Sequence, residues 1–250
     1  MSQSYLVVPD LHLKFHDPQY LSMITRILVE EGSNLSGIIQ LGDFLDNPQC
    51  SDFAQDPSRK NELWDDIGGY NMLLDVWESL LPQGAVVHQL EGNHEDRLRR
   101  YLWTKAPKVH GMVPSWPSLL KFPERHARRK LTWHWHPLAK WSSCVIGDTV
   151  FHHGKFFDRH VAVNNLDRYP GKNLVTGHTH RLQTAYRAGR WSVSLGHGSD
   201  AEKTMHEPVP TTWTQAFGIY TVHEGKGHIE VVAVDNGSCV FRGQPLKVGY

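Results

Sequence analysis

Cysteine, net charge and long apolar runs are all scarce in this chain of 250 residues. Its three cysteines, Cys50, Cys144 and Cys239, lie far apart, which excludes a disulfide framework and a paired-cysteine zinc motif and favours a reducing, cytoplasmic location. Lysine plus arginine and aspartate plus glutamate each total 26, so no bulk charge attracts nucleic acid or membrane. No apolar run reaches the roughly 18 residues of a membrane span. The run at residues 5–8 is too short for a signal peptide, so we expect no membrane partner.

Histidine, in contrast, is abundant, with 17 residues, many of them beside glycine or aspartate. The hydrophobic share of 40% and the charged share of 21% are ordinary for a globular protein. The length favours one domain over residues 1–250. We therefore look for the function in the histidines.

The first hundred residues alternate strand and helix patterns. Apolar runs at 5–8, 37–41 and 85–90 predict three strands, and helical spacing predicts helices from Asp17 to Gly32, over 61–81 and over 95–103. The pair Gly68-Gly69 leaves open whether the second pattern is one helix or two. Such a βαβαβ order implies a largely parallel sheet with active residues at the carboxyl ends of its strands.

The second half of the chain begins with an irregular segment and then returns to strand patterns. Residues 105–143 are rich in proline, tryptophan and basic residues, and we expect an insertion or cap over the site. Within it, residues 133–136 alternate tryptophan and histidine, which favours a half-buried strand over extra metal ligands. Glycine-punctuated runs then predict a mostly antiparallel second sheet, at 145–146, 150–151, 174–176, 184–187, 191–195, 217–222, 229–234 and 240–242.

Five polar clusters follow predicted strands: Asp10-Leu11-His12, Gly42-Asp43-Phe44-Leu45-Asp46, Gly92-Asn93-His94-Glu95, His152-His153-Gly154 and Gly177-His178-Thr179-His180. In an extended segment, side chains two residues apart point the same way and can reach one ion. Imidazole, carboxylate and amide oxygen suit Mn²⁺, Fe or Zn²⁺ better than Ca²⁺. Any one cluster alone is more often a turn or a surface feature, but five in this arrangement predict a metal centre.

These five clusters resemble the motifs of the calcineurin-like metallophosphoesterase superfamily, in particular its stand-alone bacterial and phage members. The resemblance implies an α/β fold, a two-sheet β sandwich flanked by helices (αββα), in the cytoplasm of a bacterium or a phage-infected cell. It also implies a dinuclear metal centre: Asp10, His12 and His180 at the first metal, Asn93, His153 and His178 at the second, and Asp43 bridging both. His153 is preferred to His152 because it directly precedes the glycine.

The same resemblance implies the chemistry of phosphate-ester hydrolysis. Two divalent ions, Mn²⁺ first and Fe, Zn²⁺ or Ni²⁺ as alternatives, lower the pKa of a shared water and so provide a hydroxide nucleophile. His94 resembles the catalytic histidine, and Asp46 resembles the carboxylate that orients it, so that the pair can assist the leaving group.

The substrate is less well defined by the sequence. Residues 97–130 carry ten basic side chains and one acidic one, and tryptophans lie nearby, which suggests a phosphodiester in DNA, RNA or a nucleotide. A solvated helix face with an aromatic core explains the same pattern. Arg97 and Arg181 are candidate phosphate contacts, and His197 is either a pocket residue or a turn residue. A phosphomonoesterase with the same centre is the alternative, and a scaffold without catalysis is a remote one; the oligomeric state stays open.

Overall fold

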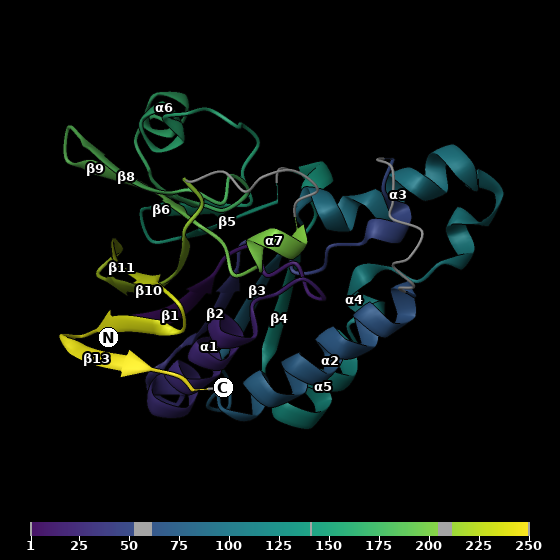
Figure 1. Cartoon of the computed structure of the whole chain (residues 1–250), viewed down its shortest axis with the longest axis horizontal. Helices are drawn as coiled ribbons and strands as arrows, with labels where there is room; N and C mark the ends of the chain where they lie inside the picture. The colour runs from purple at the N-terminus through teal and green to yellow at the C-terminus, as the bar shows by residue number, and fades with distance from the viewer. Residues whose placement is uncertain (1, 53–61, 141, 205–211, 250) are drawn as a thin grey trace.

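Two β-sheets stack face to face, and helices cover their outer faces (Figure 1). The computed structural model describes residues 2–52, 62–140, 142–204 and 212–249. The predicted fold class, an α/β two-sheet sandwich flanked by helices, is confirmed. In this part of the chain, no helix combines the length and the apolar character needed to cross a bilayer.

The first sheet has the strand order β11-β10-β1-β2-β3-β4. Its parallel strands are β1 (Gln3–Val8), β2 (Gly37–Gln40), β3 (Val86–Leu90) and β4 (Thr132–His136). Two antiparallel strands, β10 (Gln215–His223) and β11 (Lys226–Val234), extend it beyond β1. The N-terminal strand therefore lies between one strand from its own half of the chain and one from the C-terminal region.

The second sheet has the order β5-β6-β7-β9-β8. Its strands are β5 (Ser143–Ile146), β6 (Thr149–His152), β7 (Asn173–Thr176), β8 (Leu182–Arg187) and β9 (Arg190–Leu195). The central pairs β6–β7 and β7–β9 are parallel, and the outer pairs are antiparallel. A separate hairpin is formed by β12 (Ser238–Phe241) and β13 (Gln244–Lys247).

Helices of very different length surround the sheets. The α-helices are α1 (Pro18–Glu31), α2 (Leu63–Ser79), α3 (Asn93–Lys105), α4 (Trp116–Leu119), α5 (Phe122–Arg129), α6 (Val161–Arg168) and α7 (Ala201–Thr204). Short 3₁₀ turns occur at Gly32–Asn34, Pro48–Cys50, Pro107–Met112 and Leu138–Lys140. The Asp17 carboxylate accepts hydrogen bonds from the backbone N–H groups of Gln19 and Tyr20, as the predicted N-cap of α1 requires.

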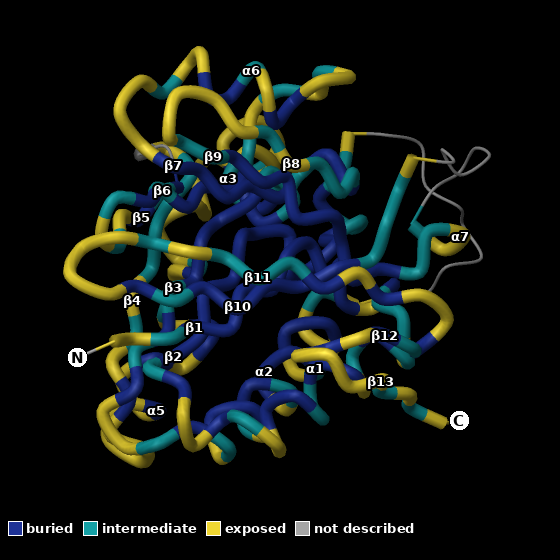
Figure 2. The backbone as a smooth tube through the Cα atoms, turned by 90° about the vertical axis from the view of Figure 1, so that its left-hand side faces the viewer, coloured by how far each residue is buried: buried dark blue, intermediate teal, exposed yellow. Residues whose placement is uncertain are grey.

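Alternation along β1 produces two cores, one on each face of the first sheet. Tyr5 and Val7 face the second sheet and pack with its strands. Leu6 and Val8 face the opposite way and pack with α1 and α2. The buried part of the chain is therefore continuous through the centre of the molecule (Figure 2). On the outer face of the second sheet, α6 packs against β8 and β9.

The predicted second sheet is wrong in composition. The runs at 217–222 and 229–234 form β10 and β11, which join the first sheet beside β1, and the second sheet is mixed rather than mostly antiparallel. Helix α2 is a single helix despite Gly68-Gly69, because packing of its buried face outweighs the roughly 1 kcal/mol that each glycine costs. The predicted start of this helix at Asn61 lies outside the described residues.

The segment at 105–143 is partly a structural element of the first sheet rather than a cover over the polar clusters. Residues 133–136 lie in β4, whose tryptophans pack on the main core. Arg125 of α5 is 2% exposed and donates hydrogen bonds to Asp75 and Glu78 of α2. Figure 1 shows α5 alongside α2. The predicted basic cap is therefore wrong for α5, whose arginines neutralise acidic residues of α2; residue 141 is not described.

Candidate metal centre

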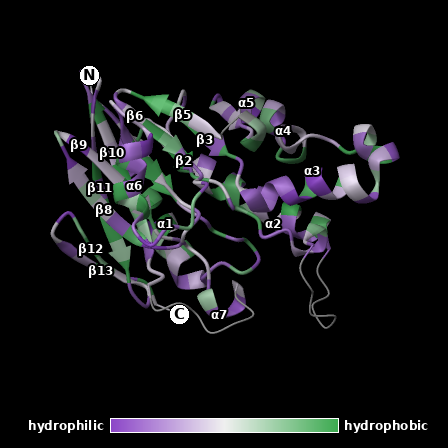
Figure 3. Cartoon of the chain, turned by 90° about the horizontal axis from the view of Figure 1, so that it is seen from above, coloured by the Kyte–Doolittle hydropathy of each residue, from purple (hydrophilic) through white to green (hydrophobic). Residues whose placement is uncertain are grey.

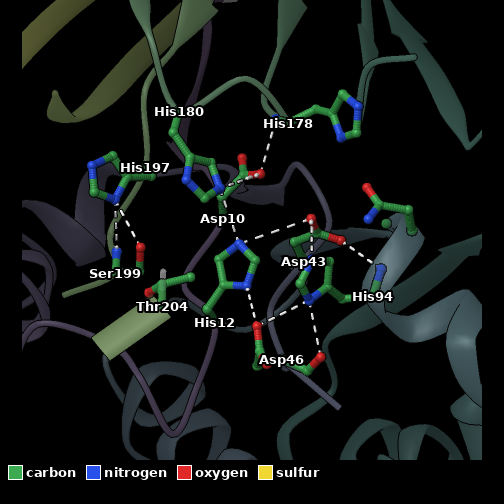
Figure 4. Close-up of polar contacts among 12 residues, drawn as sticks. Asp10, His12, Asp43, Asp46, His94, His178, His180, His197, Ser199 and Thr204 are labelled. Atoms are coloured by element: carbon green, nitrogen blue, oxygen red, sulfur yellow. Dashed lines mark hydrogen bonds and ion pairs between the residues drawn. The ribbon is translucent and has the colours of Figure 1, made fainter. Parts of the chain in front are cut away.

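All five polar clusters lie at the carboxyl ends of strands. Because β1, β2 and β3 are parallel, the loops that follow them meet at one edge of the first sheet. In the second sheet, β6 and β7 are parallel and end at the neighbouring edge. Figure 4 shows the side chains from these loops pointing toward one another. Residues up to 170 positions apart in the sequence, Asp10 and His180, thus form one cluster.

One group consists of Asp10, His12 and His180, whose ligand atoms are close enough to hold one metal ion. The Nε2 atoms of His12 and His180 are 3.0 Å apart, and His180 Nε2 is 3.6 Å from Asp10 Oδ1. Asp10 Oδ2 and His180 Nδ1 are buried and have no hydrogen-bond partner within the described ranges. Acceptors that face one another in a dry site need a cation or a proton between them.

A second group lies on the other side of Asp43. His153 Nε2 is 2.9 Å from Asn93 Oδ1 and 3.1 Å from His178 Nδ1. The opposite ring nitrogen of His153 is 2.9 Å from the Leu41 carbonyl oxygen, the type of outer contact that orients metal-bound imidazoles. His152 instead packs against Tyr169, with 5.1 Å between ring centroids. The structure therefore brings His153, and not His152, into the group.

Asp43 lies between the two groups. Its Oδ2 atom is 3.3 Å from His153 Nε2 and 3.9 Å from His12 Nε2. Its Oδ1 atom accepts a hydrogen bond of 2.9 Å from the His94 backbone N–H, which fixes the orientation of the carboxylate. The donor set of carboxylate, imidazole and amide oxygen fits two first-row divalent ions that share this carboxylate.

Burial and mutual charge determine the protonation of this cluster. Burial alone would raise the pKa of Asp43, but the charges of His153, His94 and His12 lower it well below its ordinary value. Burial lowers the pKa of His153, yet Asp43 opposes burial and raises it to about 9. Burial, helped by the charge of His153, lowers the pKa of His178 to about 3. His178 therefore has the neutral form that binds metals.

His94, Asp46 and Arg97 form a polar triad beside Asp43. His94 Nδ1 is 3.0 Å from Asp46 Oδ1, and the same carboxylate oxygen is 2.9 Å from His12 Nδ1. Arg97 donates to the Asp46 carbonyl at 2.7 Å and lies 3.1 Å from His94 Nε2. The structure thus brings Arg97 to the site. Arg181 instead donates hydrogen bonds to the Asp158 carbonyl and the Thr212 hydroxyl, and neither of these partners belongs to the cluster.

The backbone of the cluster is held in an unusual conformation. Positive φ angles occur at five of the seven predicted ligands: Asp10 at 23°, His12 at 46°, Asp43 at 48°, His178 at 73° and His180 at 58°. Non-glycine residues adopt such angles at a cost that the surrounding structure must outweigh. The tight turns direct consecutive ligands back toward the same centre.

Sequence reasoning missed Glu95, which holds the loops of the site together. This fully buried carboxylate accepts hydrogen bonds from the backbone N–H groups of Asp43, Leu45 and Gly92. It joins the loop after β2 to the start of α3. A glutamate at the third position of a helix is a capping signal, which could have indicated the bond to Gly92 but not the two bonds to the other loop.

The sequence is compatible with a pocket role or a turn role for His197, and the structure places this residue against the cluster. Its ring stacks on His180 with 4.9 Å between centroids, and Trp213 contacts both rings. A hydrogen bond of 2.8 Å to Ser199 orients it. His197 therefore packs on the ring of His180 and restricts its orientation.

A pocket of about 690 Å³ opens beside the second group of ligands. Asn93 and His178 of the second group line it, and so does Arg100. Leu138, Phe157 and Tyr169 contribute apolar and aromatic lining, and Lys155 and His152 add polar groups. Phe157 is 71% exposed and its ring centroid is 4.0 Å from that of His178.

No family model and no curated protein matches the sequence. Among solved structures, the chain matches an archaeal phosphodiesterase with a TM-score of 0.47 and 14% identity, covering 93% of this chain and 100% of that chain. It also matches Vps29 of Chaetomium thermophilum (TM-score 0.49, 12% identity, 94% and 87% covered). A third match is Vps29 of Entamoeba histolytica in complex with Zn²⁺ (TM-score 0.44, 16% identity, 92% and 99% covered). We therefore infer the function from the residues of the site itself.

Proposed function

We propose that the chain is a calcineurin-like metallophosphoesterase that hydrolyses phosphodiester bonds with two divalent metal ions, Mn²⁺ foremost. The observation that carries this proposal is the position of the Asp43 carboxylate, whose Oδ2 atom lies 3.9 Å from His12 of one group and 3.3 Å from His153 of the other. Asp10, His12 and His180 would hold one ion, and Asn93, His153 and His178 the other. The bound ions would supply a nucleophilic water at neutral pH and offset the negative charge of the phosphate.

The chain's own groups would position the reactants and move the proton. Glu95 fixes the loop that carries Asp43 through three backbone hydrogen bonds, so the carboxylate does not need to reorganise during the reaction. His94 lies 3.9 Å from Asp43 Oδ2 and has a side chain that is 15% exposed, so a substrate can reach it. We propose that His94 donates the proton that the departing oxygen needs, with Asp46 orienting its ring.

A diester is favoured over a monoester by the pocket. Its apolar and aromatic walls offer space for the second organic group of a diester, and Phe157 and Tyr169 can contact a nucleobase. The guanidinium of Arg97 is already occupied by the carbonyl and the carboxylate of Asp46, so it adds little to the binding of a dianionic monoester. A nucleotide or nucleic acid in the cytoplasm is therefore the proposed substrate class, and a phosphomonoester is the alternative.

The test is a rate ratio. Metal-stripped protein is reloaded with Mn²⁺ and given a bis-aryl phosphodiester and the matching mono-aryl ester, with Asp43→Asn as the contamination control. A ratio well above one supports the diester proposal and leads to single- and double-stranded DNA and RNA as substrates. A ratio well below one makes the chain a phosphatase. Two bound ions with no turnover of either ester would support a scaffold without catalysis.

A further inference from the structure

A second cluster of metal-ligating side chains lies away from the centre just described. His88 on β3 and His136 on β4 have ring nitrogens 3.1 Å apart, between Nδ1 of the first and Nε2 of the second. Cys144 on β5 completes a group whose ligand atoms all lie within 4.8 Å of one another. This group shares no residue with the other groups that could hold a metal among the described residues.

The pairing of β3 with β4 explains why the histidines gather. The parallel register puts His88 opposite His134, and His136 is two residues further along the same strand. Side chains two apart share one face of a sheet, so all three rings face away from the tryptophan core. The ring centroids of His88 and His134 are 5.1 Å apart, and those of His88 and His136 are 5.3 Å apart. His134 is exposed, which leaves an entry path from solvent.

We propose that His88, His136 and Cys144 bind a zinc ion, with a solvent molecule as the fourth ligand. One thiolate and several imidazoles are the ligands that a tetrahedral Zn²⁺ site uses. Two nitrogens on the same tetrahedral Zn²⁺, each at about 2.0–2.1 Å, lie about 3.3 Å from one another, close to the observed separation. A hydrogen bond with the Ser143 backbone orients the His136 ring, as outer contacts of metal-bound histidines do.

The protonation of the free site agrees with this assignment. Burial lowers the pKa of His88 to about 4, and burial also lowers the pKa of His136, so both rings are neutral and keep a lone pair for a metal. Burial raises the pKa of the Cys144 thiol to about 12, so a bound Zn²⁺ must displace its proton.

The ion would join the two sheets at their edges. Strand β4 is the last strand of the first sheet, and β5 is the last strand of the second. Figure 2 shows β3, β4 and β5 together on one side of the molecule. A zinc ion there would link the edge strands of two sheets that also pack against each other through an apolar layer.

Cobalt titration of the metal-free protein tests the proposal, because Co²⁺ bound by a thiolate has a near-ultraviolet charge-transfer band. The catalytic ligands include no sulfur, so the band reports this site alone. We expect the band in the wild type and in Asp43→Asn, and its loss in Cys144→Ser and His88→Gln. Cys239→Ser is the matched control, because Cys239 is similarly buried but lies against Met23.

Zinc binding and stability provide the second readout. We expect Cys144→Ser to bind about one equivalent of Zn²⁺ fewer than the wild type. Zinc at about 100-fold above its Kd should raise the Tm of Asp43→Asn by about 5–10 °C. It should leave the Tm unchanged in the double variant that combines Asp43→Asn with Cys144→Ser. His136→Gln serves if Cys144→Ser does not fold, and it should weaken binding at least about 10-fold. Absence of the band in the wild type, or its persistence in Cys144→Ser, overturns the proposal. Neither result depends on phosphoesterase activity.

Discussion

The Arg125 network between α2 and α5 and the histidine–aspartate centre at the strand ends both bury charged side chains, but they satisfy them differently. Arg125 donates to the carboxylates of Asp75 and Glu78, to the side-chain and backbone oxygens of Asn71 and to the Leu120 carbonyl. In the centre, acceptors face acceptors, as in the 3.0 Å approach of His12 Nε2 to His180 Nε2. The first region matches its donors and acceptors within the chain, whereas the second leaves acceptors facing one another, as a cation site does.

We therefore expect the Arg125 network to contribute mainly to stability and the histidine–aspartate centre mainly to function. A network whose donors and acceptors match contributes to folding, and removal of one member leaves an unpaired buried charge. A cluster of unmatched acceptors costs stability in the free chain and gains it when a metal binds. The positive φ angles and the partly exposed His94 lie in the loops of the centre. The Arg125 of α5, in contrast, is buried in a fully paired network. Figure 3 shows that α3, which begins at Asn93, is itself dominated by hydrophilic residues.

Removal of Asp43 should give the largest effect. Asp43→Ala takes away the one carboxylate between both groups, so we expect loss of both metal ions and a fall in kcat of at least about 10³-fold, more than a single electrostatic group usually contributes. Elemental analysis of the reloaded, dialysed protein and the diester assay measure the two losses. Circular dichroism should remain native. A variant that keeps both ions would contradict the role of Asp43 as the shared ligand.

His94→Ala should give the next largest effect. We expect kcat to fall by about 10²–10⁴-fold with both metal ions retained, because the histidine assists departure of the leaving oxygen. The loss should shrink as the leaving group becomes more acidic, and a series of aryl esters measures this. His12, Asp43 and His94 also have ligand atoms close together, so loss of a metal in this variant would make His94 a ligand instead.

Arg125→Met should affect folding and spare the centre. Glu78 has a side chain that is 1% exposed, so its charge would be left buried with less compensation. We expect the free energy of unfolding in urea to fall by about 3–5 kcal/mol. Arg128→Ala, at a 51% exposed partner of the same glutamate, is the matched control and should cost within about 1 kcal/mol. Equal losses in both variants would contradict the contrast between buried and surface pairs.

The smallest effect concerns nucleic-acid binding. Arg100 lines the pocket and is half exposed, so Arg100→Ala should reduce the slope of log affinity against log salt by about one for a single-stranded oligonucleotide. Arg128→Glu should leave the slope unchanged, because this residue pairs with α2. Fluorescence anisotropy across a salt series measures both. A lower slope in Arg128→Glu would restore the basic-segment hypothesis for α5.

From the sequence, the position of the histidine–aspartate centre could be predicted, but the pairing partners of several strands could not. Asp10, Asp43 and Asn93 follow apolar runs within three residues, and the carboxyl ends of successive parallel strands meet by geometry alone. The positions of β10 and β11 depend on pairing with β1 more than 200 residues away, and no local pattern encodes that partner. The sequence likewise shows that Arg125 lies in a basic segment, but it does not show that the side chain is buried. Its acidic partners lie 47 and 50 residues earlier in the chain.

The pairing of β1 with β10 affects when the centre can form during synthesis. Val7 pairs with Gly218, and Gln3 with Val222, so the strand that leads to Asp10 lacks one neighbour until the ribosome has passed these positions. His178 and His180 also come late in the chain. Even with metal abundant, an unfinished chain would therefore expose an unpaired apolar strand edge and incomplete metal ligands. The nascent protein should complete this strand pairing and this set of side chains only after residue 222 has been synthesised.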